Sequence, residues 1–119
     1  MDKNDIDKIE KIIRDREVYH NKLIAKNSKV YTLFKDLDNE AYKDKNLSKM
    51  QKELIALGIS IVVNCEPCMQ HHTQKALDAG ATPEQIIEVI EVAIEMSGGP
   101  AIFSSRFALK ILEYYQNKE

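Results

Sequence analysis

Residues 53–72 read ELIALGISIVVNCEPCMQHH, and the rest of the chain is organised around them. This segment holds a glutamate, a mostly apolar run, a Cys-x-x-Cys pair and two adjacent histidines. If a helix begins at Cys65, then Cys68 and His72 lie one turn apart on the same face. The positive end of a helix dipole and a neighbouring imidazolium both favour the thiolate form of cysteine. Two cysteines at this spacing can also form a disulfide without moving the backbone. The pattern therefore predicts a reactive dithiol, although a buried free cysteine is often only a small hydrophobic residue.

The chain has 119 residues, enough for one domain with a single core, and we expect residues 1–119 to form that domain. The first residues, MDKNDIDKIEK, are too charged for a signal peptide, and no apolar run reaches membrane-spanning length. We therefore expect a cytoplasmic protein that does not enter a membrane. Residues 1–52 carry 13 basic and 10 acidic side chains, and residues 53–119 carry 4 and 9. Because the basic residues are interleaved with acids, we expect no nucleic-acid surface.

Apolar residues recur at helical spacing along the chain, and no hairpin signal lies between them. Ser48 with Gln51, and Thr82 with Gln85, match the capping-box pattern at a helix start. The apolar run at residues 59–63 lacks the alternation of a strand, so we keep it helical. These patterns predict an all-α, single-domain bundle of about six helices, at about residues 5–26, 28–41, 48–63, 65–79, 83–97 and 100–116.

The helix over residues 48–63 is expected to be buried on most sides, which makes its glutamate unusual. Glu53, Ser60 and Asn64 share one face by helical spacing, so that face is expected to border a polar pocket. Spacing alone favours a different reading, in which Glu53 lies at the surface and stabilises the helix dipole. His71 points away from His72 and is expected to be exposed to solvent or to lie at an interface.

The last two predicted helices show more apolar surface than one small domain can hide, so we expect a homo-oligomer. The glutamates at positions 84, 88, 91 and 95 form one stripe of the helix at 83–97, which we interpret as its solvated side. His20 is expected to be a half-buried interface residue, because no other histidine or cysteine lies at helical spacing from it.

Several motifs together resemble one protein family. ELIAL at residues 53–57 is followed by Cys-x-x-Cys at 65–68, His72, Ala76, GAT at 80–82 and SGGPA at 97–101. From about Leu47 to Tyr115, this pattern resembles the alkylhydroperoxidase D-like branch of the carboxymuconolactone decarboxylase family. The resemblance implies an all-helical fold and a homotrimer or homohexamer. The sequence departs from the alkylhydroperoxidase proper at one point, where Glu66 and Pro67 replace a further histidine between the cysteines.

The resemblance also implies a reaction and a set of catalytic residues. Cys68 attacks a hydroperoxide or another small oxidant and becomes a sulfenic acid, and Cys65 condenses with it to a disulfide. His72 takes the proton of Cys68, and Glu53 holds His72 or relays through it. An external dithiol, from a protein or a carrier, restores the reduced form. We expect neither a cofactor nor a metal ion.

Geometry sets one condition on this relay. On one continuous helix Glu53 would lie about 18 Å from Cys65, at about 1.5 Å of rise per residue. The two helices must therefore fold back on each other across residues 63–66.

Other functions stay open. Cys65, Cys68 and His72, with His71 as a fourth donor, are legitimate zinc ligands, although their spacing on one helix makes tetrahedral closure awkward. The dithiol also suits a reductase of protein or small-molecule disulfides. A further alternative is the decarboxylation of a lactone acid, the reaction after which the family is named, although that reaction has no use for two thiols. The simplest alternative is an oligomeric scaffold protein without catalytic activity.

Overall fold

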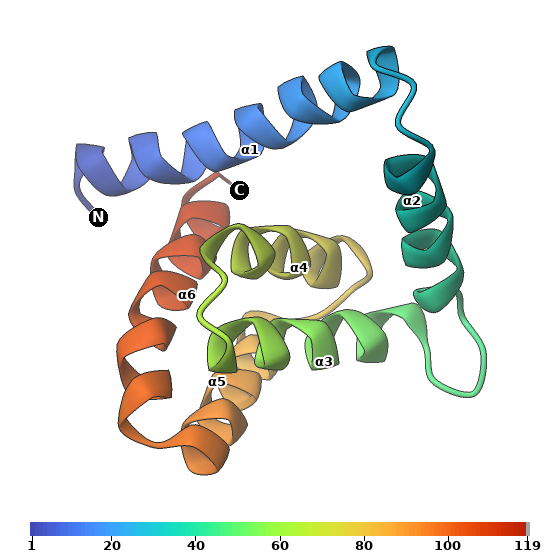
Figure 1. The fold of residues 1–119 in the computed structure, drawn as a ribbon. Coiled ribbons are helices and arrows are strands. Elements are labelled where there is room, and N and C mark those ends of the chain that lie inside the picture. Colours follow the sequence, from blue (N-terminus) through green and yellow to red (C-terminus); the bar gives the residue numbers. More distant parts are fainter. Residues whose placement is uncertain (119) are drawn as a thin grey trace.

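The computed structural model describes residues 1–118, which form six α-helices and no strand (Figure 1). The helices are α1 (Lys3–Ala25), α2 (Lys29–Ala41), α3 (Lys49–Val62), α4 (Glu66–Asp78), α5 (Pro83–Ser97) and α6 (Gly99–Asn117). The predicted all-α fold is confirmed, and no predicted helix end lies more than two residues from the observed one.

Side-chain caps fix the starts of α3 and α5. The Ser48 hydroxyl accepts a hydrogen bond from the Gln51 amide at 3.1 Å, and the Gln51 side chain accepts one from the Ser48 amide at 2.8 Å. Thr82 and Gln85 make the same pair of bonds at 3.1 and 2.9 Å. These reciprocal bonds satisfy amides that no helical carbonyl reaches. Both predicted capping boxes are therefore present.

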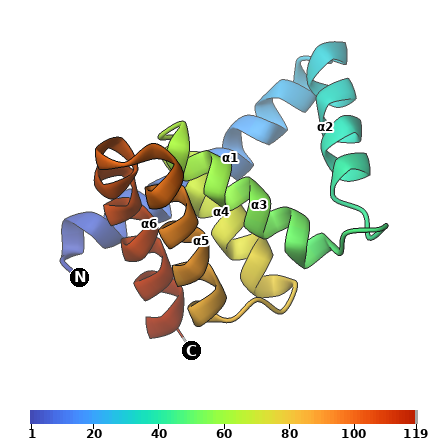
Figure 2. The same ribbon diagram turned by 90° about the horizontal axis from the view of Figure 1, so that it is seen from below.

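Helices α3, α4, α5 and α6 pack around one hydrophobic core (Figure 2). Each contributes apolar side chains at helical spacing that are fully buried. They include Leu57 and Ile61 of α3, Met69 and Ala76 of α4, Ile86 of α5 and Ile111 of α6. Burying each of the larger side chains is worth about 1.5–3 kcal/mol, which makes this cluster the main source of stability.

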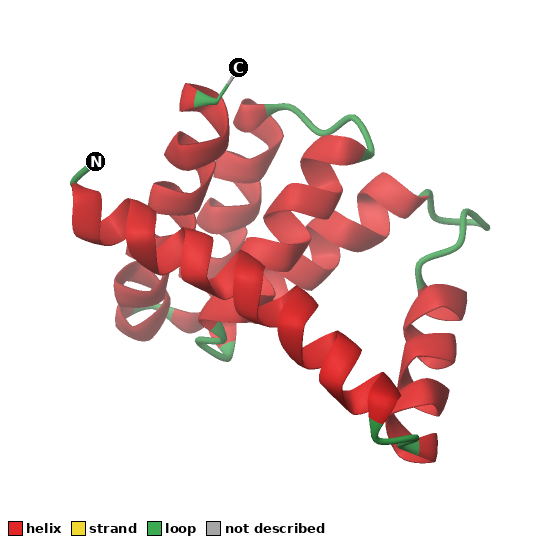
Figure 3. Cartoon of the chain, turned by 90° about the horizontal axis from the view of Figure 1, so that it is seen from above, coloured by secondary structure: helices red, strands yellow, loops and turns green. Residues whose placement is uncertain are grey.

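Helix α1 lies across this four-helix unit, and its N-terminal half is attached to it (Figure 3). Ile9 is fully buried in the core. Lys110 of α6 binds the Asp5 carboxylate at 2.9 Å, and the Tyr114 hydroxyl donates to Glu10 at 3.0 Å. The N-terminal half of α1 is thus tied to α6 by packing and by polar contacts.

The C-terminal end of α1 and the start of α2 extend beyond the four-helix unit (Figures 1 and 3). The main helix contact of α2 is with α1, and Lys35, Asp38 and Asn39 of α2 line a cavity with residues of α3 and α4. His20 Nδ1 lies 2.6 Å from the Tyr31 hydroxyl and joins the two helices. His20 is half-buried as predicted, and its place at a subunit interface stays a prediction.

Helix α3 is less buried than the sequence predicted. Ile55, Ile59 and Val62 expose 51%, 58% and 43% of their surface, because the helices in contact with α3, which are α4, α5 and α6, leave this side of it uncovered. On α6, Phe103 is likewise 62% exposed although Phe107, one turn later, is buried. Helical periodicity shows that a stripe is apolar, but it does not show whether the chain itself covers that stripe.

No helix within residues 1–118 combines the length and the apolar character that a crossing of the lipid bilayer requires.

Candidate functional site

The junction of α3 and α4 builds the site. Asn64, with φ at 55°, adopts the left-handed conformation, and its amide donates to the Ile61 carbonyl at 3.1 Å. The Cys65 amide donates to the Ser60 carbonyl at 3.0 Å. This pair of bonds is the Schellman motif, which ends a helix and reverses the chain at once. The predicted reversal across residues 63–66 is therefore present, and α4 packs directly against α3.

Asn64 corrects one prediction. It was expected to share a pocket-facing side of α3 with Glu53 and Ser60, but it lies after the end of the helix and is exposed. The physical reason is that asparagine tolerates the left-handed conformation that the helix end requires. Ser60 is buried as expected, and its hydroxyl donates to the Ala56 carbonyl of its own helix at 2.7 Å.

Cys65 and Cys68 are joined by a disulfide, with their Cα atoms 5.2 Å apart. Cys65 is the N-cap of α4, and its sulfur accepts a hydrogen bond from the Cys68 amide at 3.3 Å. Both cysteines are half-buried, whereas Pro67 between them is exposed. The two sulfurs therefore lie at the positive end of the α4 dipole, where a thiolate is favoured once the disulfide is reduced.

Glu53 and His72 meet across the α3–α4 contact. His72 Nδ1 lies 2.7 Å from Glu53 Oε1, and Lys49 Nζ lies 3.3 Å from Glu53 Oε2. Glu53 is only 2% exposed, so the reading that placed it on the surface is wrong. A carboxylate can only accept hydrogen bonds, so the shared proton is on His72 Nδ1. In the neutral ring this leaves Nε2 as a proton acceptor, on a residue one helical turn after Cys68.

His71 lies beside His72, not away from it. The two rings have centroids 5.0 Å apart, and His71 is half-buried, so the expectation of a solvent-exposed residue is wrong, while its place at a subunit interface stays a prediction. Burial, followed by the nearby charges of Arg16 and His72, lowers the pKa of His71 to about 3. His71 is therefore neutral at physiological pH.

A small polar cavity of about 150 Å³ lies beside this pair of histidines. It is lined by Lys35, Asp38, Asn39, Tyr42, Lys49, Glu53, His71 and Lys75. The Tyr42 ring lies 5.4 Å from the His72 ring, centroid to centroid. Burial raises the pKa of Tyr42, and the charge of Glu53 adds to that effect, so the phenol keeps its proton. Tyr42 is a residue of the site that sequence reasoning missed, because only the fold brings its loop to α4.

Helix α1 braces the Cys-x-x-Cys segment from the opposite side. Lys8 Nζ lies 2.9 Å from the Glu66 carboxylate, and Arg16 donates to the Pro67 carbonyl. Arg16 also lies 3.3 Å from Gln70 of the next turn. Glu66 by itself disfavours a neighbouring thiolate, and the lysine charge offsets part of that effect. These contacts join residues more than fifty positions apart, so no local pattern indicates them.

Among the described residues, no group of three or more His, Cys, Asp and Glu side chains is arranged to hold a metal ion. His72 uses Nδ1 to bind Glu53, so it has only Nε2 left for another partner.

Comparisons with known proteins extend beyond the site to most of the chain. Residues 28–110 match the model of the carboxymuconolactone decarboxylase family. An uncharacterized protein of Cupriavidus necator is 38% identical over 82 residues, which cover 69% of this chain and 70% of that protein. The alkyl hydroperoxide reductase AhpD of Corynebacterium kroppenstedtii is 31% identical over 52 residues, which cover 44% of this chain and 30% of that enzyme.

Solved structures with the same fold cover nearly the whole chain. A carboxymuconolactone decarboxylase family protein from Legionella pneumophila superposes with a TM-score of 0.82 at 31% identity, over 93% of this chain and 96% of that one. A family protein from Thermotoga maritima, for which a part in the antioxidative response has been suggested, gives 0.81 at 27% identity, over 90% and 91%. On the motif at residues 53–72, the shared fold and the match over residues 28–110, this chain belongs to the carboxymuconolactone decarboxylase family.

Proposed function

We propose that this protein is a dithiol oxidoreductase that reduces hydroperoxides and is regenerated by an external dithiol. The observation that supports this most is the buried Glu53–His72 hydrogen bond of 2.7 Å, one helical turn from a Cys65–Cys68 disulfide. A structural disulfide has no need of a buried carboxylate and imidazole at its edge. A thiol that must lose a proton and then attack an oxidant does need such a pair.

In the proposed cycle the reduced protein begins with two thiols, and His72 Nε2 takes the proton of Cys68. The Cys68 thiolate attacks the terminal oxygen of the hydroperoxide, the O–O bond breaks, and the alcohol leaves with a proton. Cys68 is then a sulfenic acid. The Cys65 sulfur displaces its hydroxyl as water, and the disulfide forms. An external dithiol supplies the two electrons and two protons that restore the thiols.

The surroundings of each sulfur support the assignment of Cys68 as the thiol that attacks the peroxide and of Cys65 as the thiol that resolves the sulfenic acid. Cys68 shares its helical face with His72, so its proton has an acceptor in the same turn. Cys65 is the N-cap residue, at the mouth of α4 beside the exposed Pro67, where a reducing partner has access. Glu53 holds the imidazole through Nδ1, and Lys49 Nζ binds the other oxygen of the carboxylate.

Two relatives add support from outside the chain. The enzyme from Corynebacterium kroppenstedtii is named an alkyl hydroperoxide reductase, and its match is limited to 52 residues. An antioxidative role has been suggested for the Thermotoga maritima protein, which shares the whole fold. The further histidine between the cysteines of the alkylhydroperoxidase proper is replaced here by Glu66 and Pro67, so the proton must pass through His72.

The test is a single-turnover experiment on the fully reduced protein. One equivalent of hydroperoxide is added, and the oxidation state of each cysteine is read by mass spectrometry before and after. We expect one Cys65–Cys68 disulfide per chain and one alcohol per hydroperoxide. If the thiols do not react with hydroperoxide but the disulfide still exchanges with other dithiols, the protein is a disulfide reductase and the proposal is wrong.

A further inference from the structure

Helix α2 turns its apolar side away from its own chain. Val30, Leu33, Phe34 and Leu37 form one face at helical spacing and are exposed by 79%, 54%, 58% and 64%. The opposite side of α2 lines the polar cavity at Glu53, through Lys35, Asp38 and Asn39. An amphipathic helix of a globular protein normally turns its apolar stripe toward the core. The reversed orientation of α2 therefore requires an apolar partner outside this chain.

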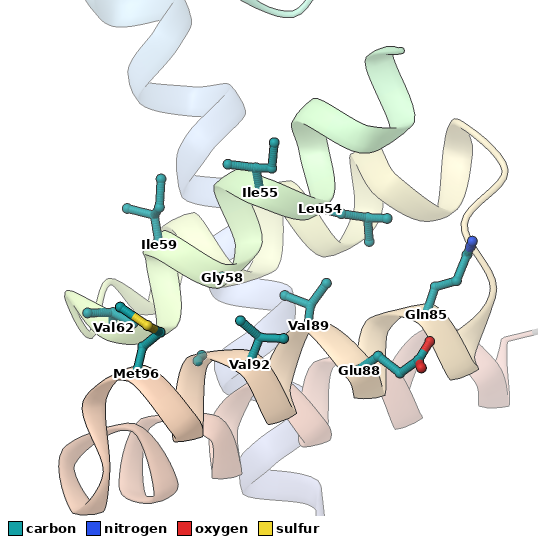
Figure 4. A pocket seen from close by; sticks show the side chains of 11 residues that line it. Leu54, Ile55, Gly58, Ile59, Val62, Gln85, Glu88, Val89, Val92 and Met96 are labelled. Carbon is teal, nitrogen blue, oxygen red and sulfur yellow. The ribbon is translucent and has the colours of Figure 1, made fainter. Parts of the chain in front are cut away.

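An open apolar groove of about 660 Å³ runs between α3 and α5 (Figure 4). Its walls are formed by Ile55, Ile59 and Val62 of α3 and by Val89, Val92 and Met96 of α5. Several of these side chains are more than half exposed, Val92 by 63% and Met96 by 74%. Gln85 and Glu88 give one end of the groove a polar edge (Figure 4).

We propose that α2 of one copy of this chain lies in the α3–α5 groove of a second copy. The two surfaces match in length. At 1.5 Å per residue, the apolar stripe from Val30 to Leu37 spans about 10 Å, and the α3 wall from Leu54 to Val62 spans about 12 Å. An amphipathic helix laid into an apolar groove is a common mode of recognition between proteins.

Gly58 supports a helix as the occupant. It lies in the middle of α3, where glycine lowers the stability of a helix. A methyl group built at Gly58 would meet only Val89 Cγ1, at an ordinary distance of 3.4 Å, so packing within the chain does not require glycine there. The missing side chain leaves room in the groove for a large apolar side chain, and Phe34 is the largest on the exposed face of α2.

The charges around the two surfaces are complementary. Residues 18–35, from the end of α1 through the first half of α2, carry four lysines at positions 22, 26, 29 and 35 and no acid, whereas the last turns of α2 carry Asp36, Asp38 and Glu40. Helix α5 carries four glutamates at positions 84, 88, 91 and 95 and no lysine or arginine. The glutamate stripe lies along one side of the groove by helical spacing. Complementary charges of this kind set the register and favour the correct partner.

This docking couples assembly to the redox site. The side of α2 that faces away from the groove closes the cavity beside Glu53 and His71 of its own chain. A neighbouring copy that holds α2 would thus hold one wall of that cavity. Since α2 and the groove are different surfaces, two copies must exchange their α2 helices about a two-fold axis, or several copies must close a ring.

The first measurement is the mass of the wild-type protein by sedimentation at micromolar concentration. We expect an oligomer, and we expect Phe34→Asp to give a monomer with unchanged helix content. A wild-type monomer with the native fold, or a Phe34→Asp protein that keeps the full oligomer mass, would overturn the proposal.

The second measurement uses chains in which Cys65→Ser and Cys68→Ser remove the native thiols, so its result does not depend on redox activity. Copies with Leu33→Cys are co-expressed with differently tagged copies that carry Val92→Cys. Mild oxidation should link the two kinds of copy to each other and should link neither kind to itself. Copies with Glu113→Cys, an exposed position of α6, serve as the control partner for Val92→Cys and should not be linked. Links that form mainly between two Val92→Cys copies would instead show groove-to-groove packing and would contradict the proposal.

Discussion

Replacing Glu53 by glutamine tests what the carboxylate does for His72. Glu53 accepts from His72 Nδ1 on one oxygen and from Lys49 Nζ on the other. Glutamine has only one oxygen, and Lys49 can only donate, so the amide oxygen must turn toward Lys49. The amide NH₂ group then faces His72 Nδ1. The neutral imidazole can accept this N–H hydrogen bond at Nδ1 only in the tautomer that carries its proton on Nε2.

In this tautomer His72 can no longer take the proton of Cys68. The loss of a general base costs about a hundred- to ten-thousand-fold in rate. We therefore expect Glu53→Gln to slow the reaction of the reduced dithiol with hydroperoxide by about that factor, as much as His72→Gln does. Each tenfold step corresponds to about 1.4 kcal/mol of activation free energy. The disulfide should still form when a strong oxidant is supplied, because neither cysteine is changed.

The measurement is the rate constant for thiol loss after rapid mixing of the reduced protein with hydroperoxide. The matched control is the double variant Glu53→Gln/Lys49→Met. Without Lys49, the glutamine oxygen can turn back to His72 Nδ1–H, so the double variant should react faster than Glu53→Gln alone. Lys49→Met alone should change the rate little. If Glu53→Gln keeps the wild-type rate constant, or if removing Lys49 gives no recovery, the tautomer argument is wrong.

Two further predictions concern the sulfurs and the core. After one equivalent of hydroperoxide, a sulfenic-acid trap should label Cys68 in the Cys65→Ser protein and nothing in the Cys68→Ser protein; a label on Cys65 in the latter would reverse the two roles. In the core, the Thr73 hydroxyl is buried and has no hydrogen-bond partner among residues 1–118, a condition that costs about 1–3 kcal/mol. Thr73→Val should raise the free energy of unfolding by about 1 kcal/mol in urea titrations, whereas the control Thr32→Val removes a bond to the Ser28 carbonyl and should not.

The helices could be predicted from the sequence because their signals are local. A capping box spans four residues, so both boxes could be predicted from the sequence. The left-handed turn at Asn64 is local too, but helical spacing placed Asn64 on the helix face with Glu53, and the structure corrected this. Local signals do not predict the pairing of Glu53 with His72, because nineteen positions and a chain reversal separate the two residues. Spacing alone placed Glu53 on the surface, and only the family resemblance indicated the pair.

Contacts made by separate elements could not be predicted. The bonds from Lys8 and Arg16 to the Cys-x-x-Cys segment depend on how α1 lies across α4. The burial of His71 depends on residues of α2 and on Tyr42, which reach it only in the folded chain. The periodicity of α2 predicts an amphipathic helix equally well for either orientation. Which side faces its own chain follows from tertiary packing, so the exposed apolar stripe is visible only in the structure.

The altered titration of His71 predicts how stability depends on pH. Burial, followed by the charges of Arg16, His72 and the lysines at 75 and 35, lowers its pKa from 6.5 to about 3. Between these two values the unfolded chain binds a proton at this site and the folded chain does not. The contribution of His71 to the free energy of unfolding is therefore fully present above pH 6.5 and is lost as the pH falls from 6.5 toward 3.

From pH 7 to pH 5, the free energy of unfolding should fall by at most about 2 kcal/mol through this group alone. The measurement is a series of urea titrations between pH 7 and pH 5 on the wild type and on His71→Gln. Glutamine does not titrate in this range, while His20, His72 and all carboxylates are common to both proteins. The difference between the two curves therefore isolates His71. The wild type should lose more stability than the variant as the pH falls. If the two curves run parallel, His71 has the same proton affinity in the folded and unfolded chains, and its burial beside His72 does not keep it neutral.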